Sequence, residues 1–279
     1  SIIGFGVGFA HNGFIPIPEI QFLAYVHNAE DQLRGEAATL PFFSKGQFTN
    51  PMVLRIPGLA YQKGFGGHFH NDNSLTIFRD IPGIILAVPS NGSDAVKMLR
   101  TAVKEAYING RVIVFVEPIA LYMTKDLHNP KDGGWSFTYP ELDKEITVGE
   151  FYSYGESRLF TIITYGNGLY LSLQAKKEIE KKIKKKIKVI DLRWLAPINY
   201  KNLIKNIEKC KNILIVDECR KTGCHGEGLL GELVTRIGNQ SKIELHAADD
   251  SFIPLGVAAT ATLPSKVSIV KKSLDLLNG

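Results

Sequence analysis

Three side chains have the chemistry and the spacing of a ligand site: an amide, an aromatic ring and a histidine. Gln21 and Tyr25 are four residues apart, so on a helix both would face the same way. Such a pair offers hydrogen bonds and a ring to stack on, which suits a flat heteroaromatic ligand. A half-buried core tyrosine beside a surface amide has the same spacing, so spacing alone leaves both interpretations open.

The histidine is His70, in a glycine-rich, polar segment over residues 64–73. This segment lies between two predicted strands, and loops held by a rigid sheet often carry catalytic groups. A histidine titrates near neutrality and can exchange a proton with a reacting group. His68 could line the same cavity. A loop histidine bonded to the neighbouring backbone is the structural alternative.

Short apolar runs alternate with longer helical patterns, which predicts an α/β fold with a mostly parallel sheet. The predicted strands are rich in Val, Ile and Leu without polar alternation, as expected when both faces of a sheet are covered. They span residues 15–20, 52–56, 84–89, 112–116, 159–165, 187–192, 213–217 and 243–247. A helix is predicted over residues 93–108, with Ser93 or Asp94 as its N-cap and Asn109-Gly110 as its end.

The alternation breaks over residues 125–149, which contain two prolines and Trp135 but few apolar repeats. Such a segment is typical of a linker. We therefore predict a first domain over residues 1–130, a linker over 131–148 and a second domain over 149–279. Charged residues that follow or end strands of the second domain are expected at sheet ends or interfaces, namely Arg193 and Asp217-Glu218.

The net charge of +5 is concentrated in one segment. Residues 176–188 contain eight lysines and two glutamates, a net of +6, so the rest of the chain sums to 5 − 6 = −1. Ile179, Ile183 and Ile187 recur there every four residues, which predicts an apolar stripe on a solvated amphipathic helix. Docking to an acidic partner is the alternative. Because the positive charge is confined to this one segment, nucleic acid is not expected as a partner. A membrane span is not expected either, since no apolar run reaches the roughly 18 residues needed to cross a bilayer.

The cysteines and the N-terminal glycines do not form recognisable binding motifs. Three cysteines cannot form a paired disulfide framework, which favours a reducing compartment and a cytoplasmic location. Cys219, Cys224 and His225 lack the second ligand pair of a closed zinc site, so no metal site is expected in this chain. Close helix packing is predicted for three glycines that follow no strand and fail the phosphate-loop pattern: Gly4, Gly6 and Gly8.

Two motifs together carry a resemblance to a known family. Residues 19–25 read Glu-Ile-Gln-Phe-Leu-Ala-Tyr, and Gly66-Gly67-His68-Phe69-His70 follows further along the chain. In order and spacing they resemble the beta part of the 2-oxo acid decarboxylase that opens the 2-oxo acid dehydrogenase complexes. The resemblance runs from Ile2 to Leu255. It implies a thiamine diphosphate-binding, transketolase-like pyrimidine domain, followed by a transketolase C-terminal-like α/β domain.

The resemblance also implies roles and partners. It places Gln21 and Tyr25 around the aminopyrimidine ring of thiamine diphosphate, the expected cofactor. His70 precedes Pro82-Gly83 by the family's spacing, which makes His70 rather than His68 the expected catalytic histidine. The diphosphate and its Mg²⁺ would be bound mainly by an alpha part outside this chain. The expected partners are that alpha subunit or fused alpha region and a lipoyl acyltransferase, in a homodimer or alpha2-beta2 multienzyme assembly.

The reaction implied is decarboxylation of a 2-oxo acid with transfer of the acyl group to lipoyl. The amino-acid sequence of residues 19–22 favours the branched-chain type of 2-oxo acid dehydrogenase. Pyruvate-type dehydrogenase, transketolase-like ketol transfer and a non-catalytic assembly module are the alternatives. In the family a glutamate that bonds the cofactor would fall two positions before Ser1, so we expect an N-terminally truncated fragment that is inactive alone.

The chain departs from the family's motifs at several places. Asn71-Asp72-Asn73 stands where the family has Ser-Gln-Ser, and Met123 replaces the arginine after Leu-Tyr. Residues 222–226 replace a Thr-Gly-Gly-Phe-Gly-like turn, and residues 109–111 depart from the pattern that holds a monovalent cation. These differences bear on substrate and cation binding, whereas fold and cofactor class do not depend on them.

Overall fold

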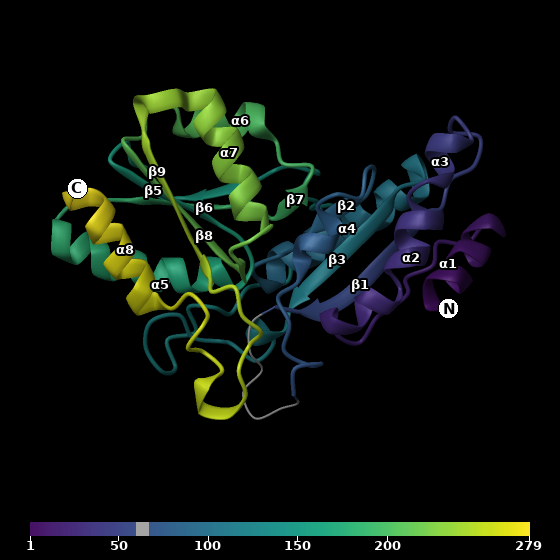
Figure 1. Ribbon diagram of the computed structural model, residues 1–279, viewed down its shortest axis with the longest axis horizontal. Coiled ribbons are helices and arrows are strands. Elements are labelled where there is room, and N and C mark those ends of the chain that lie inside the picture. The colour runs from purple at the N-terminus through teal and green to yellow at the C-terminus, as the bar shows by residue number, and fades with distance from the viewer. Residues whose placement is uncertain (60–66) are drawn as a thin grey trace.

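The computed structural model describes residues 1–59 and 67–279, so residues 64–66 of the predicted histidine loop lie outside the described residues. Two α/β units lie side by side, each built on its own sheet (Figure 1). The first half of the chain, purple to blue, forms most of one unit, and the green and yellow second half forms the other. The predicted fold class, α/β with mostly parallel sheets, is confirmed.

The first sheet has the strand order β1-β3-β2-β7. Three of its strands are parallel, and their Val, Ile and Leu side chains are buried on both faces, as predicted. β7 comes from the second half of the chain and pairs antiparallel with β2, so each half contributes to this sheet. The strands are β1 (Met52–Gly58), β2 (Ile85–Ala87), β3 (Val112–Pro118) and β7 (Trp194–Ala196).

The strand predicted over residues 15–20 is wrong. This segment lies beside β1 and makes single hydrogen bonds to it, because the Arg55 N–H donates to the Pro18 carbonyl (2.9 Å) and the Ile20 N–H donates to the Arg55 carbonyl (3.0 Å). Pro16 and Pro18 have no N–H, so the segment cannot form a full ladder. It still runs parallel to β1 and brings Gln21 towards the carboxyl end of that strand.

One long helix and several short ones accompany the first sheet. The long helix α4 (Gly92–Asn109) is capped by Asn91, whose side-chain oxygen accepts a bond from the Asp94 N–H (2.9 Å), and not by the predicted Ser93 or Asp94. Gly110, with φ 62°, ends it as predicted. The others are α1 (Ile2–His11), η1 (Leu23–Asn28), α2 (Glu30–Gln32), η2 (Leu33–Ala37), α3 (Leu40–Phe43), η3 (Leu75–Phe78) and η4 (Ile119–Leu121).

The second sheet has the order β4-β6-β5-β8-β9 and helices on both faces. Leu214 and Val216 pack under α5 and α8, while Ile213 and Ile215 pack under α6 and α7, because alternate strand residues face opposite sides. Its strands are β4 (Tyr152–Tyr154), β5 (Phe160–Thr164), β6 (Lys188–Asp191), β8 (Asn212–Arg220) and β9 (Lys242–Ala248). Its helices are α5 (Asn167–Ile183), α6 (Tyr200–Ile207), α7 (His225–Ile237), η5 (Gly238–Gln240), η6 (Gly256–Ala258) and α8 (Lys266–Asn278).

The lysine-rich helix is shorter than the isoleucine spacing predicts. α5 ends at Ile183, and Lys184 adopts the left-handed conformation (φ 53°) that closes it. Ile187 therefore lies outside the helix, in the turn before β6, and it is buried there. The apolar stripe is right for Ile179 and Ile183 and wrong for Ile187.

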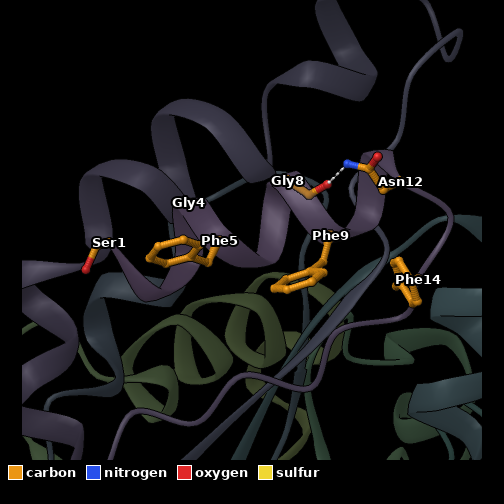
Figure 2. Close-up of a pocket in the computed structure, with 7 residues that line it drawn as sticks. All are labelled: Ser1, Gly4, Phe5, Gly8, Phe9, Asn12 and Phe14. Carbon is orange, nitrogen blue, oxygen red and sulfur yellow. Dashed lines mark hydrogen bonds between the residues drawn. The ribbon is translucent and has the colours of Figure 1, made fainter.

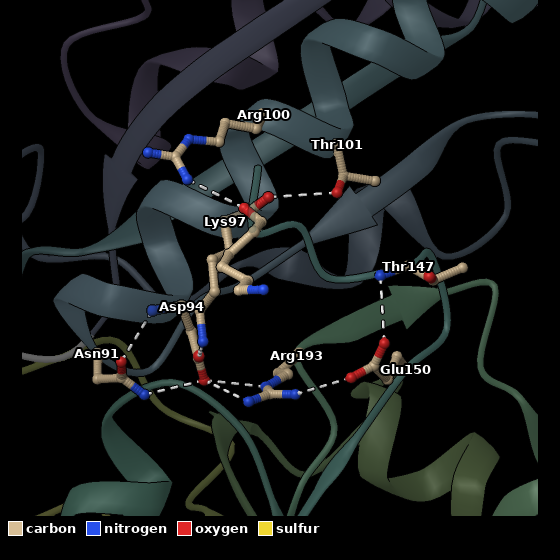
Figure 3. A network of polar contacts seen from close by, with 9 residues as sticks. Asn91, Asp94, Lys97, Arg100, Thr101, Thr147, Glu150 and Arg193 are labelled. Atoms are coloured by element: carbon tan, nitrogen blue, oxygen red, sulfur yellow. Dashed lines mark hydrogen bonds and ion pairs between the residues drawn. The ribbon is translucent and has the colours of Figure 1, made fainter. Parts of the chain in front are cut away.

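A polar network at the start of α4 joins the two units (Figure 3). The Arg193 guanidinium, from the turn after β6, donates two hydrogen bonds to Asp94 Oδ2, from Nε (2.9 Å) and Nη2 (2.7 Å). Glu150 lies on the other side of Arg193, at 3.8 Å from Nη1. Further along α4, Arg100 donates to carbonyls of residues 140–144, and Thr101 Oγ1 donates to the Ile146 carbonyl (2.8 Å). α4 thus holds both the second unit and the segment that leads to it.

Candidate active site

The predicted histidine meets the predicted tyrosine segment near the carboxyl end of β1. The His70 ring packs edge-on against Phe22, with ring centroids 4.5 Å apart, and lies 6.4 Å from the Tyr25 ring. Tyr25 also stacks on Phe69, at 5.9 Å and 14° between the ring planes. Four rings from two segments that are distant in sequence therefore form one aromatic cluster. In parallel α/β sheets, ligands bind at this carboxyl end of the strands.

Gln21 and Tyr25 do not share a helix, so the prediction from their spacing is wrong. Phe22 is extended (φ −143°, ψ 150°), and the 3₁₀ helix η1 begins only at Leu23. Tyr25 is 36% exposed and Gln21 is also exposed, so both side chains can be reached from outside. The contact with Phe22, rather than helical spacing, brings Tyr25 and His70 together.

His68 and His70 differ in surroundings. His68 is exposed and packs on Phe69, with ring centroids 4.0 Å apart. His70 is half-buried against Phe22 and Tyr25. Its backbone N–H donates to the Gly67 carbonyl (3.0 Å) in a tight turn. His70 is therefore the histidine whose ring has a fixed place in the cluster. Phe22 and Phe69 were not predicted as site residues, because nothing in the spacing shows that Phe22 contacts His70 or that Phe69 contacts Tyr25.

Buried acids of the second unit lie at the carboxyl ends of its strands. Burial, together with the neighbouring Asp217, raises the pKa of Glu218 to about 8. Burial also raises the pKa of Asp191 to about 7, although Arg193 and the Ser90 hydroxyl oppose that rise. Glu218 Oε1 accepts a bond from the Asn167 N–H (3.3 Å), and the Ser90 hydroxyl donates to Asp191 Oδ1 (2.8 Å). One oxygen of each acid therefore bonds to a protein group.

The group Cys219, Cys224 and His225 is buried. Burial raises the pKa of the Cys224 thiol to about 12 and lowers the pKa of His225 to about 4, so both are neutral at pH 7. Within residues 1–59 and 67–279, no three His, Cys, Asp or Glu side chains gather as a metal site would require. None of the helices in this described part of the chain combines the length and apolar character needed to cross a bilayer.

Comparison with known proteins agrees with the two-unit architecture. Residues 1–123 match the transketolase pyrimidine binding domain, and residues 155–246 match the transketolase C-terminal domain. Similar curated proteins include the pyruvate dehydrogenase E1 component subunit beta of Staphylococcus aureus strain Mu50, 29% identical over 99% of this chain and 81% of that protein. The same subunit of Staphylococcus epidermidis is 29% identical over 98% of this chain and 79% of its own length.

The chain is a homologue of the 2-oxo acid dehydrogenase E1 beta subunits. Among solved structures, a "Split gene transketolase, inactive beta4 tetramer" has the same fold, with a TM-score of 0.74, 17% identity and coverage of 99% of this chain and 80% of that one. The predicted resemblance is confirmed, including the order of a pyrimidine domain and a C-terminal domain. The E1 beta family belongs to enzymes that use thiamine diphosphate.

The residues present fit one wall of such a cofactor site. The Tyr25 ring packs on Phe69 and is 36% exposed, so part of its aromatic surface is accessible to a flat heteroaromatic ring. His70 lies next to that ring with its own orientation set by Phe22. The described part of this E1 beta homologue offers a half-site: an aromatic wall and a histidine, open on one side.

Proposed function

We propose that this chain is the beta portion of a 2-oxo acid dehydrogenase that decarboxylates its substrate and acylates a lipoyl group. The observation that carries the proposal is the Tyr25–Phe22–His70 cluster at the carboxyl end of β1, in a pyrimidine-binding domain. We assign Gln21 and Tyr25 to cofactor binding and His70 to catalysis. The domain limits 1–130, 131–148 and 149–279 remain part of the proposal, as does a cytoplasmic location.

When bound, thiamine diphosphate supplies the electron sink that decarboxylation of a 2-oxo acid needs. The residues of this chain supply position and proton handling. Tyr25 and Gln21 would hold the pyrimidine ring, Tyr25 through its aromatic face and Gln21 through its amide. His70 holds or transfers a proton at a nitrogen of its own imidazole ring, and Phe22 keeps that ring in place. The alpha part would hold the diphosphate and Mg²⁺ and would close the open side.

Assembly into a larger particle is supported by an exposed face of α1 (Figure 2). Phe5 and Phe9 are 68% and 53% exposed on this helix, beside a cavity of about 520 Å³. A Cβ atom added at Gly4 or Gly8 would meet nothing within 4 Å, whereas one at Gly6 would lie 3.5 Å from Met52 Cε. At Gly6 this is an ordinary contact with a side chain, so among the described residues the predicted close packing is wrong for all three glycines. Contiguous exposed aromatic rings mark interaction surfaces, and we assign this one to a second subunit in a homodimer or alpha2-beta2 assembly.

The α1 assignment has a direct test. Gly8→Leu adds a bulky side chain at an open position, so the fold should be kept while close approach of a second helix is blocked. We expect a smaller particle by analytical ultracentrifugation. Lys271→Leu, at an exposed position of α8 in the second unit, serves as the control. An unchanged assembly for Gly8→Leu would contradict this use of the face.

Substrate preference is the finer part of the proposal. Residues 19–22 favour a branched-chain 2-oxo acid, whereas the similar curated proteins are pyruvate dehydrogenase subunits. We keep the branched-chain acid as the prediction and pyruvate as its alternative. The acyltransferase that receives the product is proposed on the same grounds as the alpha partner, from the family to which the chain belongs.

Carbon dioxide release by the full-length natural polypeptide with its alpha partner tests the function. The mixture contains thiamine diphosphate, Mg²⁺ and an artificial electron acceptor, with 3-methyl-2-oxobutanoate or pyruvate as substrate. We expect cofactor-dependent release that His70→Ala lowers by about 100-fold, while His68→Ala stays near wild type. No release from either acid by a folded protein with bound cofactor would favour ketol transfer. Absence of cofactor binding would favour the assembly module.

A further inference from the structure

The segment that follows His70 is held by the end of β8 in the second unit. Arg220 Nη1 donates to Asn73 Oδ1 (3.1 Å) and lies 3.6 Å from Asp72 Oδ1, and Arg220 Nη2 donates to the Ser74 hydroxyl. In the reverse direction, the Asn73 amide donates to the Glu218 carbonyl (2.7 Å). One guanidinium therefore contacts three consecutive residues, beginning two positions after His70.

A β-bulge directs the end of β8 towards this segment. The pairing of β8 with β9 shifts between Asp217 and Arg220, which leaves Glu218 and Cys219 without an opposite residue. Bulges bend a strand and redirect its side chains, and they are frequent beside active sites. Here the bulge presents the Glu218 carbonyl and the Arg220 side chain to the same short stretch of the first unit.

Asp72 connects this contact to the tyrosine segment. The Ser74 hydroxyl donates to Asp72 Oδ1 (2.7 Å), and His27 Nε2 lies 3.9 Å from Asp72 Oδ2. His27 belongs to η1, the helix that carries Tyr25. The Asp72 carbonyl also accepts a bond from the Leu59 N–H (3.0 Å) at the end of β1. Asp72 is thus the residue through which Arg220 can fix both segments of the aromatic cluster.

We propose that Arg220 is a positioning residue that holds the His70 loop in its working geometry across the boundary between the two units. The inference rests on the proposed catalytic role of His70. Arg220 acts through Asp72, Asn73 and Ser74, and the first two of these stand where this chain departs from the family's Ser-Gln-Ser. Its planar fork holds two separate nitrogen donors at a fixed spacing towards these acceptors, whereas a lysine offers a single ammonium nitrogen.

A second arginine separates positioning from simple contact between the units. Arg79 also crosses the boundary, because its Nη1 donates to the carbonyls of Gly223 (2.9 Å) and Cys224 (3.1 Å). Its side chain is about as exposed as that of Arg220, 37% against 27%. Arg79 follows η3 and does not contact Asp72, Asn73 or Ser74 in any described hydrogen bond or ion pair. Arg79→Met therefore removes a comparable contact without releasing the loop.

The test compares Arg220→Met, Arg220→Lys and Arg79→Met in the full natural polypeptide with its alpha partner. Hydrogen–deuterium exchange of residues 67–74 reports on the loop without requiring activity. For Arg220→Met we expect faster exchange there and a kcat lower by about 10- to 100-fold, with little change in KM. Arg220→Lys should be intermediate, and Arg79→Met should resemble wild type in both.

Two results would overturn the inference. One is wild-type exchange and wild-type kcat in Arg220→Met, and the other is an equally fast exchange and an equally lowered kcat in Arg79→Met. If His70→Ala keeps full activity, the proposed function of His70 is wrong, and Arg220 cannot position a catalytic group there. Exchange then separates the two failures, because it still shows whether Arg220 holds the loop.

Discussion

Two arginines of the second unit reach the first, and their surroundings differ. Arg193 is buried, with its side chain 6% exposed, and bonds to one carboxylate on the rigid helix α4. Arg220 is 27% exposed and contacts three residues of a loop. A buried charge pair is costly to break, because removal of one partner leaves the other without compensation. A partly exposed arginine finds water instead. Arg193 therefore locks the two units together, and Arg220 sets local geometry.

The contact between Arg193 and its carboxylate partner, Asp94, depends on pH. Burial alone would raise the pKa of Asp94, but the charges of Arg193 and Lys97 hold it below its usual range. A carboxyl with a lowered folded-state pKa contributes stability above its unfolded pKa, and this stability is lost as the pH falls through the folded pKa. The lock should therefore weaken only in acid, below about pH 4.

The largest expected effect on stability is at the buried pair of Arg193 and Asp94. Asp94→Ala should lower the free energy of unfolding by about 3 to 5 kcal/mol, because it leaves Arg193 buried without its main partner. Denaturant titration followed by circular dichroism measures the loss. Glu145→Ala, which breaks the exposed pair with Lys104, should cost less than about 1 kcal/mol. Equal losses for the two variants would break the comparison.

An intermediate effect is expected at Glu218, beside Arg220. Because burial raises its folded-state pKa to about 8, the stability it contributes is fully present below its unfolded pKa and is lost as the pH rises towards 8. Glu218→Gln cannot ionise at this side chain, so its unfolding free energy should fall less than that of wild type between pH 5 and pH 6.5, and the difference between the two falls should be about 2 kcal/mol. Thermal melts at each pH measure this. Parallel pH curves for wild type and variant would contradict the assignment.

The smallest effect on stability is expected for Arg220→Met. Arg220 is itself 27% exposed, and without it Asp72 still accepts a hydrogen bond from the Ser74 hydroxyl, so the unfolding free energy should fall by only about 1 kcal/mol. The same denaturant titration that detects Asp94→Ala measures it. A loss as large as that of Asp94→Ala would mean that Arg220 also locks the units, and the distinction between the two arginines would disappear.

Much of the fold could be predicted because buried parallel strands leave continuous apolar runs. The strands predicted over 52–56, 112–116 and 213–217 lie within β1, β3 and β8. The short strands β4 and β7 were missed, since three residues carry no periodicity and their pairing depends on a neighbour elsewhere in the chain. The run over 15–20 misled because its prolines cannot donate to a ladder.

The site could be predicted only in part. Family motifs pointed to Tyr25 and His70, and the structure places their rings 6.4 Å apart. The link between them, Phe22, belongs to a tertiary contact that no local spacing encodes. The contact between Arg220 and Asp72 could not be predicted from the sequence, because it depends on a bulge at the end of β8 and on how the two units pack.

Thiamine diphosphate binding to the assembled protein tests the central claim, that Gln21 and Tyr25 form the cofactor wall beside His70. Isothermal titration in the presence of Mg²⁺ would compare Gln21→Ala, Tyr25→Ala and His70→Ala with Tyr139→Ala, which removes an exposed ring elsewhere. We predict a Kd raised about 3- to 10-fold for the first two, from a lost hydrogen bond and a lost stacking contact. His70→Ala and Tyr139→Ala should bind as wild type does, with decarboxylation lost only in His70→Ala. Unchanged binding in both Gln21→Ala and Tyr25→Ala would contradict the account.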